Sequence, residues 1–354
     1  MSKPIIYQLF PRYFANYNET RAYNGSKEEN GCGRFADINK RALKSIVDLG
    51  ATHVWYTGII RHATAQYNNP AITKGKAGSP YAITDYYDVD PDLAKNESKR
   101  MQEFESLVKR THEAGLGVLI DFVPNHVARE YKSVCKPEGV EDLGENDHPE
   151  WAFSPLNNFY YLPGERFTMD KDLQGYEEFP AKVTGNDCFT SHPSENDWYE
   201  TVKLNYGVFY QGGREKQFDP IPSTWTKMRD IILFWAGKGI DGVRVDMAEM
   251  VPVEFFQWAI AAVKKKHKKF LFIGECDDPN QSDSYLAAGF DYLYDKVGMY
   301  DYLRGVTCKG WPASGITAQW MQHGEERLNH MLYFLENHDE QRIATGFFCG
   351  SRRR

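Results

Sequence analysis

Four apolar runs in this chain each lead into acidic, asparagine or histidine residues. They lie within residues 117–126, 239–250, 270–276 and 331–339. Short apolar or alternating runs of this kind are typical of strands with at least one buried face. In a barrel of parallel strands, all carboxyl ends meet at one rim, where the active site lies. The four runs therefore predict an α/β chain of the TIM (β/α)8 type, with these polar side chains gathered at one end.

The run at 243–246 alternates apolar and charged residues, which places Arg244 and Asp246 on one face of the expected strand. An arginine beside an aspartate favours the ionised carboxylate and lowers its pKa. Such a carboxylate can act as a nucleophile, although an isolated pair of this kind is more often a structural ion pair. Glu275 follows the apolar residues 270–273, so partial burial is expected to raise its pKa and to suit it to proton donation.

Composition and charge exclude several classes of protein. The chain has 354 residues, enough for one large barrel plus an insertion, and 42% apolar and 26% charged residues are normal for a soluble protein. The net charge is −7 and the short basic run at 264–269 is interpreted as a solvated helix end, which disfavours nucleic-acid binding. No apolar stretch reaches about 18 residues, so no membrane span is expected.

The cysteines and the start of the chain suggest a cellular location. The 6 cysteines show no metal-like spacing and are expected to be reduced thiols. Residues 1–7 enter a strand directly and lack a signal-peptide pattern. We therefore expect a cytoplasmic protein, or a secreted one whose signal peptide is missing from this sequence. No sequence pattern for zinc, haem, nucleotide or flavin is present.

Strand and helix patterns alternate along most of the chain. The expected strands span residues 5–10, 52–56, 117–126, 243–246, 270–275, 290–297 and 331–339, and the expected helices span 37–49, 98–114, 222–238, 253–266, 283–288 and 316–329. Successive strand–helix units predict a parallel sheet. Residues 127–205 break the pattern with many Pro, Gly, Asn and aromatic residues, and a long irregular segment inside a domain is expected to be functional.

Taken together, four short patterns resemble the signature regions of the α-amylase family, glycoside hydrolase family 13. They are D-x-x-x-N-H ending at His126, G-x-R-x-D ending at Asp246, the strand-end Glu275, and N-H-D ending at Asp339. The resemblance covers roughly residues 4–348. It implies a discontinuous barrel domain at 1–126 and 206–354 and a small insertion domain at 127–205, after the third strand.

The resemblance also implies roles for individual residues. Asp246 would be the nucleophile, Glu275 the acid and base, and Asp339 a third catalytic carboxylate that grips sugar hydroxyls. The resemblance further implies retention of configuration, for which the two reacting carboxyl groups should lie roughly 5–5.5 Å apart. The implied substrate-binding residues are Tyr81, His126, Arg244 and His338, with Asp85 and Asp121 in support and Trp198 and Tyr206 as further candidates.

Calcium is the one cofactor that the resemblance leaves open. Many members of the family hold a structural Ca²⁺ between barrel and insertion, and Asn125 matches one ligand position. Calcium takes six to eight oxygens, usually including carboxylates, and no partners for Asn125 are evident in the insertion. Glu249 and Met250 stand where many family amylases have lysine and histidine, so the leaving-side subsites are expected to differ.

The implied activity is cleavage of α-1,4-glucosidic bonds in starch or maltooligosaccharides, with an α-glucan as the binding partner. The alternatives are an α-glucosidase, a cyclomaltodextrinase or a transglycosylase of the same family, or an inactive remnant that only binds glucan. An unrelated barrel enzyme that uses Asp and Glu to abstract protons is a further alternative.

The residues after Arg342 are too few for an eighth strand, its helices and the C-terminal β-domain that the family usually carries. We therefore expect an open barrel of seven strands with exposed edges on the first and the seventh. A homo-oligomer could cover this open edge.

Overall fold

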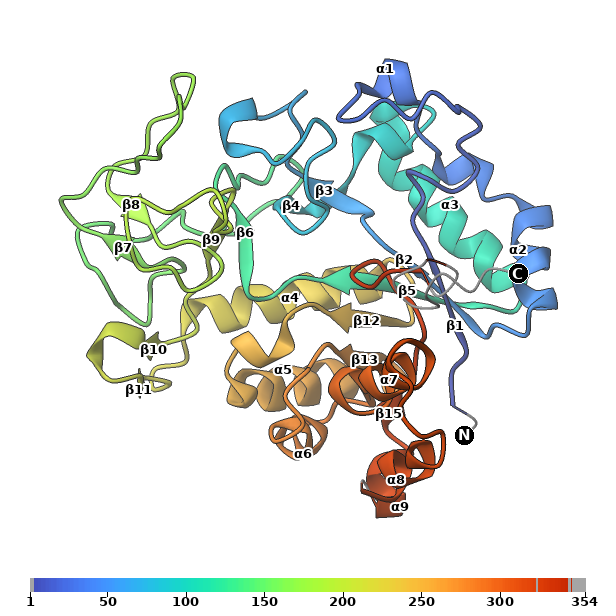
Figure 1. The fold of residues 1–354 in the computed structure, drawn as a ribbon. Coiled ribbons are helices and arrows are strands. Elements are labelled where there is room, and N and C mark those ends of the chain that lie inside the picture. The colour runs from blue at the N-terminus through green and yellow to red at the C-terminus, as the bar shows by residue number, and fades with distance from the viewer. Residues whose placement is uncertain (1–2, 323, 343–344, 346–354) are drawn as a thin grey trace.

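The computed structural model describes residues 3–322, 324–342 and 345, and its centre is a 7-stranded sheet (Figure 1). Each strand pairs in parallel with the next one in the order β1-β2-β5-β12-β13-β14-β15. The strands are β1 (Ile6–Leu9), β2 (His53–Tyr56), β5 (Gly117–Phe122), β12 (Gly242–Val245), β13 (Leu271–Gly274), β14 (Tyr292–Tyr294) and β15 (Met331–Leu332). The predicted α/β barrel architecture is confirmed.

The barrel is open between β15 and β1 within the described residues. These two strands form the ends of the sheet and do not pair with each other. A cavity of about 280 Å³ opens at this edge, and residues of the barrel interior line it, among them Ile6, Trp55 and Leu332. The predicted open edge is therefore confirmed, whereas its coverage by a second copy stays a prediction. The expectation that residues 349–354 add no barrel element lies outside the described residues.

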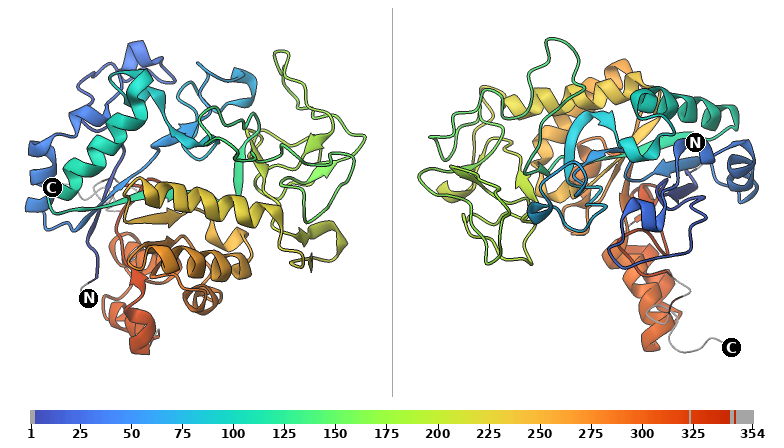
Figure 2. Two further views of the ribbon diagram at one scale, coloured as in Figure 1. Left: turned by 180° about the vertical axis from the view of Figure 1, so that it is seen from behind. Right: turned by 90° about the horizontal axis from the view of Figure 1, so that it is seen from above.

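Four helices pack on the outer surface of the sheet between β1 and β13 (Figure 2): α2 (Lys40–Asp48), α3 (Arg100–Glu113), α4 (Ser223–Gly237) and α5 (Val253–Lys266). Their apolar faces are buried, as the helical spacing predicted. Asn39 caps α2 by accepting hydrogen bonds from the backbone N–H groups of Arg41 and Ala42. Among the described residues, no helix combines the length and the apolar character needed to cross a membrane.

The segment after β13 differs most from the sequence-based expectations. It forms α6 (Ser282–Ala287), α7 (Asp301–Lys309), α8 (Gly315–Gln322) and α9 (Gly324–Leu328), and α7 was not predicted. The expected strand at 290–297 ends early because the Asp295 side chain accepts a hydrogen bond from the Met299 backbone N–H and starts a helical turn at Lys296–Tyr300. The expected strand at 331–339 pairs only at Met331–Leu332, where β14 is its one neighbour.

The insertion leaves the barrel after β5 and extends to one side of it (Figure 1). It contains the short strands β6 (His126–Ala128), β7 (Tyr161–Leu162), β8 (Ala181–Lys182) and β9 (Thr201–Lys203), and β6 pairs with β9 at its base. The strand pair β10 (Val208–Phe209) and β11 (Glu215–Lys216) follows. Residues 129–200, all of which are described, contain no helix. The exact domain boundaries, 127 and 205, stay a prediction.

A two-stranded hairpin lies between β2 and α3, in a segment that the sequence analysis treated as a loop. Its strands β3 (Ile60–His62) and β4 (Ile83–Val89) pair antiparallel, with an irregular register. Gly78 lies in the connection between them, and a Cβ there would come 1.6 Å from the Ala63 carbonyl oxygen. Only glycine fits this close approach. The hairpin carries Tyr81 to the rim of the barrel.

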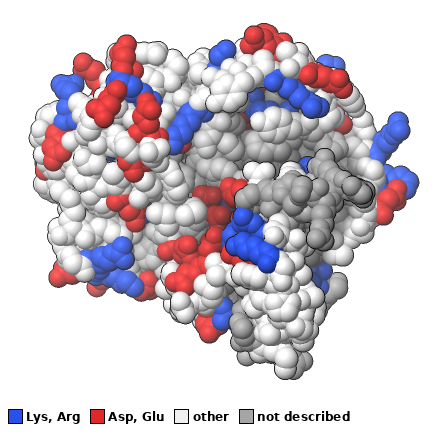
Figure 3. Space-filling view, in the orientation of Figure 1, with Lys and Arg blue, Asp and Glu red and all other residues white. Residues whose placement is uncertain are grey.

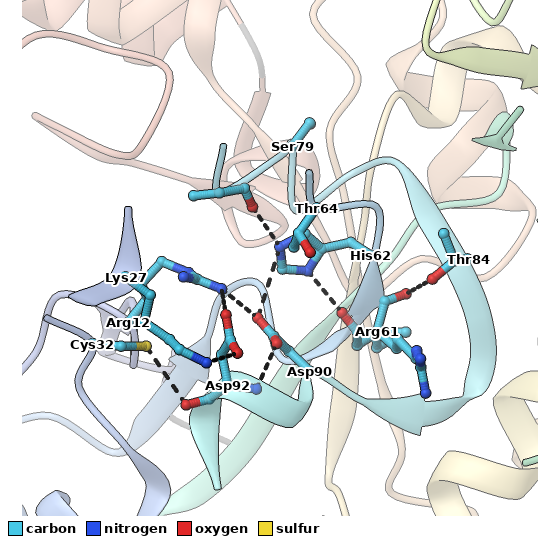
Figure 4. Close-up of polar contacts among 12 residues, drawn as sticks. Arg12, Lys27, Cys32, Arg61, His62, Thr64, Ser79, Thr84, Asp90 and Asp92 are labelled. Carbon is cyan, nitrogen blue, oxygen red and sulfur yellow. Dashed lines mark hydrogen bonds and ion pairs between the residues drawn. The ribbon is translucent and has the colours of Figure 1, made fainter. Parts of the chain in front are cut away.

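A buried cluster of charged groups ties this hairpin to the loop that follows β1 (Figure 4). One Arg12 nitrogen, Nη2, lies 2.8 Å from Asp90 Oδ2 and 3.4 Å from Asp92 Oδ2. Lys27 Nζ lies 2.7 Å from Asp92 Oδ1. The Asp92 backbone N–H donates to Asp90 Oδ1, which closes the turn after β4. Two cations thus balance two buried carboxylates, and the sequence analysis did not find this cluster.

We expect Arg12→Met to destabilise the protein by about 3–5 kcal/mol, because it leaves a buried carboxylate pair without its main cation. Denaturant unfolding followed by circular dichroism measures this loss. Lys44→Ala is the matched control: it breaks the exposed pair with Asp48, which should cost less than about 0.5 kcal/mol. Equal losses of stability in the two variants would contradict the inference that Arg12 balances a buried pair of carboxylates.

Candidate active site

The Arg244 guanidinium is the centre of the candidate site. It projects from β12 into the barrel and its side chain is 1% exposed. Its Nη1 donates to Asp246 Oδ1 at 2.6 Å, and its Nη2 forms an ion pair with Glu275 Oε1 at 2.9 Å. Asp121 Oδ1 lies 3.6 Å from Nη1, and Asp339 Oδ2 lies 3.9 Å from Nη2. The structure thus brings together the three carboxylates that the sequence analysis proposed as catalytic.

Strand register explains this convergence. Arg244 pairs with Asp121 of β5 and with Ile273 of β13, so the carboxyl ends of these neighbouring strands lie level. Glu275 is the first residue after β13. Its Oε2 accepts a hydrogen bond of 2.7 Å from the Met247 backbone N–H. Met247 has a φ of 44°, a strained conformation for a residue with a side chain, and this directs its N–H at the carboxylate.

Burial dominates the pKa values of the two central carboxyl groups. It raises the pKa of Glu275 to about 7, against the opposing effect of Arg244. It also raises the pKa of Asp246 to about 6, although the hydrogen bond from Arg244 opposes this. The sequence analysis expected Arg244 to lower the pKa of Asp246, and the net direction is the reverse because desolvation outweighs the ion pair. Groups this close titrate together, so the two apparent pKa values belong to the pair of carboxyl groups rather than to either residue alone.

Tyr81 and His338 form one wall of the site. Their rings stack at a centroid distance of 5.3 Å, and the Tyr81 hydroxyl lies 2.6 Å from His338 Nε2. The same hydroxyl donates to Asp121 Oδ1 at 3.3 Å. His338 Nε2 also lies 3.0 Å from Asp339 Oδ2. Burial, aided by Arg244, lowers the pKa of His338 to about 3, so the imidazole is neutral.

Two residues that the sequence analysis missed complete this network. The Gln8 amide group donates to His338 Nδ1 at 2.9 Å, which leaves the proton of the neutral ring on Nε2. The Tyr294 hydroxyl accepts from Arg244 Nε at 3.2 Å. Gln8 lies on β1 and Tyr294 on β14, where alternation alone could have placed both side chains inside the barrel.

His126 lies at the junction of barrel and insertion. It is buried, its ring lies 5.2 Å from that of Trp198, and burial lowers its pKa to about 3. Asp85 does not face the cleft. Its carboxylate accepts hydrogen bonds from the backbone N–H groups of Val134, Cys135 and Tyr87, and its expected support of Tyr81 stays a prediction.

Tyr206 is a packing residue. It is 3% exposed, and its hydroxyl donates to the Pro124 carbonyl oxygen. Its role as a candidate glucan contact is therefore wrong.

A cleft of about 980 Å³ opens beside the network, lined by Gln8, Tyr81, His338 and Asp339 among others. Acidic side chains gather near the middle of the face shown in Figure 3. A cleft of this size accommodates several sugar rings and presents neutral donors and ionisable acceptors to their hydroxyl groups.

The residues around Asn125 do not fit a calcium ion. The Asn125 Oδ1 atom, which would be the ligand, accepts a hydrogen bond of 2.8 Å from the Lys203 ammonium. Calcium takes six to eight oxygens, and a cation already occupies this one. Within the part of the chain that the structure describes, the one group of acidic and thiol side chains close enough to share an ion is Asp85, Asp88 and Cys135. Arg61 and Arg100 bind Asp88.

The fold and the site define a (β/α) barrel with clustered carboxylates at the carboxyl ends of its strands. Residues 8–353 match the family model for the alpha amylase catalytic domain. The chain therefore belongs to the α-amylase family, glycoside hydrolase family 13, as the resemblance implied.

Comparisons with individual proteins agree with this family assignment. The chain is 26% identical to an α-amylase of Streptomyces lividans over 86% of its own length and 34% of that protein. It is 27% identical to an alpha-1,4-glucan:maltose-1-phosphate maltosyltransferase of Cereibacter sphaeroides over 81% of its length and 41% of that protein. The crystal structure of an α-amylase from Lactobacillus plantarum aligns with a TM-score of 0.61 at 26% identity, over 96% of this chain and 64% of that one. The chain thus spans well under half the length of these curated relatives.

The raised pKa of Glu275 makes the stability of the fold depend on pH. Its folded pKa of about 7 lies above its usual value of about 4.3. The folded state therefore binds the extra proton between these values, and stability is lost as pH rises through this window. In Glu275→Gln this loss is removed, so its melting temperature relative to wild type should rise by a few degrees between pH 4 and pH 8.

The test is how the difference in melting temperature between variant and wild type changes with pH. The absolute size of this difference is not the test, because Glu275→Gln also removes an ion pair of Arg244. Asp246→Asn is the matched variant and should show the same trend, with most of the change complete by about pH 6. Differential scanning calorimetry at several pH values measures both. A difference from wild type that stays constant with pH would contradict the raised pKa values.

Proposed function

We propose that this chain hydrolyses α-1,4-glucosidic bonds in starch or maltooligosaccharides with retention of configuration. The observation that carries the proposal is the shared guanidinium: Arg244 contacts both Asp246 and Glu275 at 2.6 and 2.9 Å. One arginine thus holds two carboxyl groups at the ends of adjacent strands. Retaining glycosidases need such a pair, one group ionised and one protonated, on either side of the scissile bond.

In the first step, an Asp246 oxygen attacks the anomeric carbon while Glu275 donates its proton to the leaving glycosidic oxygen. The bond from carbon to the leaving oxygen breaks and a covalent glycosyl ester forms. Burial raises the pKa values of both groups, so the pair can hold one proton near neutral pH, and the hydrogen bond from Arg244 to Asp246 favours the ionised form of Asp246. Arg244 keeps Asp246 ionised against the cost of burial.

In the second step, the Glu275 carboxylate takes a proton from water as the water oxygen attacks the same carbon. The ester bond to Asp246 breaks, and both side chains return to their starting protonation states. Two inversions give net retention. The carboxyl separation of roughly 5–5.5 Å that this mechanism needs stays a prediction.

The sugar at the cleavage point is proposed to lie against Tyr81, His338 and Asp339. The Tyr81 ring offers an apolar face, and the neutral His338 donates its Nε2–H to the Tyr81 hydroxyl, which fixes that ring in place. Asp339 is half-exposed toward the cleft and can accept from sugar hydroxyls. His126, on the insertion side, is the fourth proposed contact. Arg244, whose side chain is 1% exposed, is proposed to act by holding Asp246 and Glu275, and its direct contact with the sugar stays a prediction.

Transfer to a sugar acceptor instead of water is the second candidate. Glu249 lies against the segment after Glu275, because its Oε2 accepts hydrogen bonds from the backbone N–H groups of Asp277 and Asp278. This acidic residue is proposed to lie on the leaving side of the scissile bond, where an acceptor sugar would bind. The similarity to a maltosyltransferase is consistent with the same idea. Product analysis with maltotriose distinguishes the two, since transfer yields longer oligosaccharides and hydrolysis yields only shorter ones.

The first test is reducing-sugar release from soluble starch. We expect activity in the wild type and a loss of more than about 10⁴-fold in Asp246→Asn, which cannot form the ester. Glu275→Ala should lose about 10²–10⁴-fold on starch. It should keep the first step with maltosyl fluoride, whose leaving group needs no proton. Glucan binding without any hydrolysis or transfer by the wild type would support the inactive remnant instead.

The pH dependence of kcat/KM is a second test. Activity should fall below about pH 6, where Asp246 becomes protonated, and above about pH 7, where Glu275 loses its proton. With maltosyl fluoride as substrate, the alkaline limb of the first step should disappear while the acid limb remains. An alkaline limb that is unchanged with the fluoride would overturn the role of Glu275 as the acid.

A further inference from the structure

A buried lysine lies at the seam between the barrel and the insertion. Lys203 is on β9, opposite His126 of β6, and its side chain is 2% exposed. Its ammonium group donates to Asn125 Oδ1 at 2.8 Å and forms an ion pair with Asp187 Oδ1. Asn125 follows β5 of the barrel, whereas Lys203 and Asp187 belong to the insertion. The ammonium therefore links the two parts directly.

Asn125 is held on its other side as well. Its Nδ2 donates to the Gly185 carbonyl oxygen at 2.7 Å and lies 3.1 Å from His126 Nδ1. The backbone carbonyl of Asn125 accepts from the Leu204 N–H at 3.0 Å. The side chain and the main chain of Asn125 thus bind Gly185 and the end of β9, where the insertion returns to the barrel.

The surroundings of the ammonium are built for one positive charge. A lysine ammonium has three N–H donors. The Asn125 amide oxygen and the Asp187 carboxylate face it, and the Tyr210 ring centroid lies 5.1 Å from Nζ, within the range of a cation–π contact. Asp187 itself is in the left-handed region, with a φ of 62°, and its side chain is 31% exposed. A buried charge persists only where such partners compensate its loss of water.

We propose that the Lys203 ammonium is the cation that joins the insertion to the barrel in this protein, and that Asn125 takes no divalent metal ion. Calcium needs six to eight oxygen ligands. The seam supplies one amide oxygen and one carboxylate, and the ammonium contacts both. A covalently attached cation also cannot be lost to a chelator. Lys203 thereby acts as a positioning residue for the segment that carries His126.

The first experiment compares the wild type with EDTA, with added CaCl₂ and with neither. We expect the three melting temperatures to agree within about 1 °C. The loss of even one weak interaction would shift the melting temperature by more than this. Equilibrium dialysis against radioactive calcium should show less than one bound ion per chain at micromolar concentrations. A fall of several degrees in EDTA that calcium reverses, or stoichiometric calcium binding, would overturn the proposal.

The second experiment removes the charge. Lys203→Met keeps the length of the side chain but leaves Asp187 and Asn125 without their cation, and the melting temperature should fall by about 6 °C or more. The double variant with Asp187→Asn should recover part of this loss, because the unpaired carboxylate is then neutral.

Lys182→Met is the matched control from the neighbouring strand. Lys182 pairs with Glu178 at 3.5 Å, and its side chain is 20% exposed. Its loss should be less than about 3 °C, since Glu178 keeps its ion pair with Arg129 when Lys182 is removed. If Lys203→Met and Lys182→Met melt at the same temperature, the ammonium does not hold the seam. These measurements do not require activity, so the result is independent of the proposed hydrolysis.

Discussion

The site depends on one guanidinium buried at the centre of an open barrel. Arg244 contacts Asp246 and Glu275 and has Asp121 and Asp339 within 4 Å, so one cation faces four carboxyl groups. A single positive charge cannot neutralise four negative ones in a low dielectric. Burial raises the pKa values of Asp246 and Glu275, and the neighbouring carboxylates add to this effect, so these groups keep protons that they would lose in water. The site therefore holds carboxyl groups that can exchange protons near neutral pH, as the proposed chemistry needs.

A second buried cation organises the junction with the insertion in the same physical way. Lys203 compensates Asp187 and the Asn125 amide oxygen, whereas Arg244 compensates the carboxylates of the barrel. Both cations are almost fully buried and both are paired, as a buried charge must be. The two sites differ in the number of carboxylates for each cation: one carboxylate faces Lys203 and several face Arg244. The seam thus pairs one ammonium group with one carboxylate, while the active site keeps an excess of acidic groups.

Much of the fold and the candidate site could be predicted because strand alternation and helix spacing are local signals. The alternation at 243–246 was enough to place Arg244 and Asp246 together, and helix α5 was predicted with its exact bounds, Val253–Lys266. The β3–β4 hairpin was missed because its pairing joins residues about 25 positions apart with an irregular register. Helix α7 was missed because the apolar run before it resembled a longer strand. Gln8 was missed because nothing near it in the sequence shows that His338 would be its partner.

The sequence by itself determined which chemical groups stand at the strand ends: the carboxylates Asp246, Glu275 and Asp339, with Arg244 two residues before the first. Only the tertiary structure decided how those groups behave. Desolvation depends on side chains brought in from distant strands, and it raises the pKa of Asp246 although the neighbouring arginine lowers it. The tertiary structure also decided the role of Asn125, which resembles a calcium ligand in sequence. Lys203, 78 residues further along the chain, places its ammonium on that oxygen.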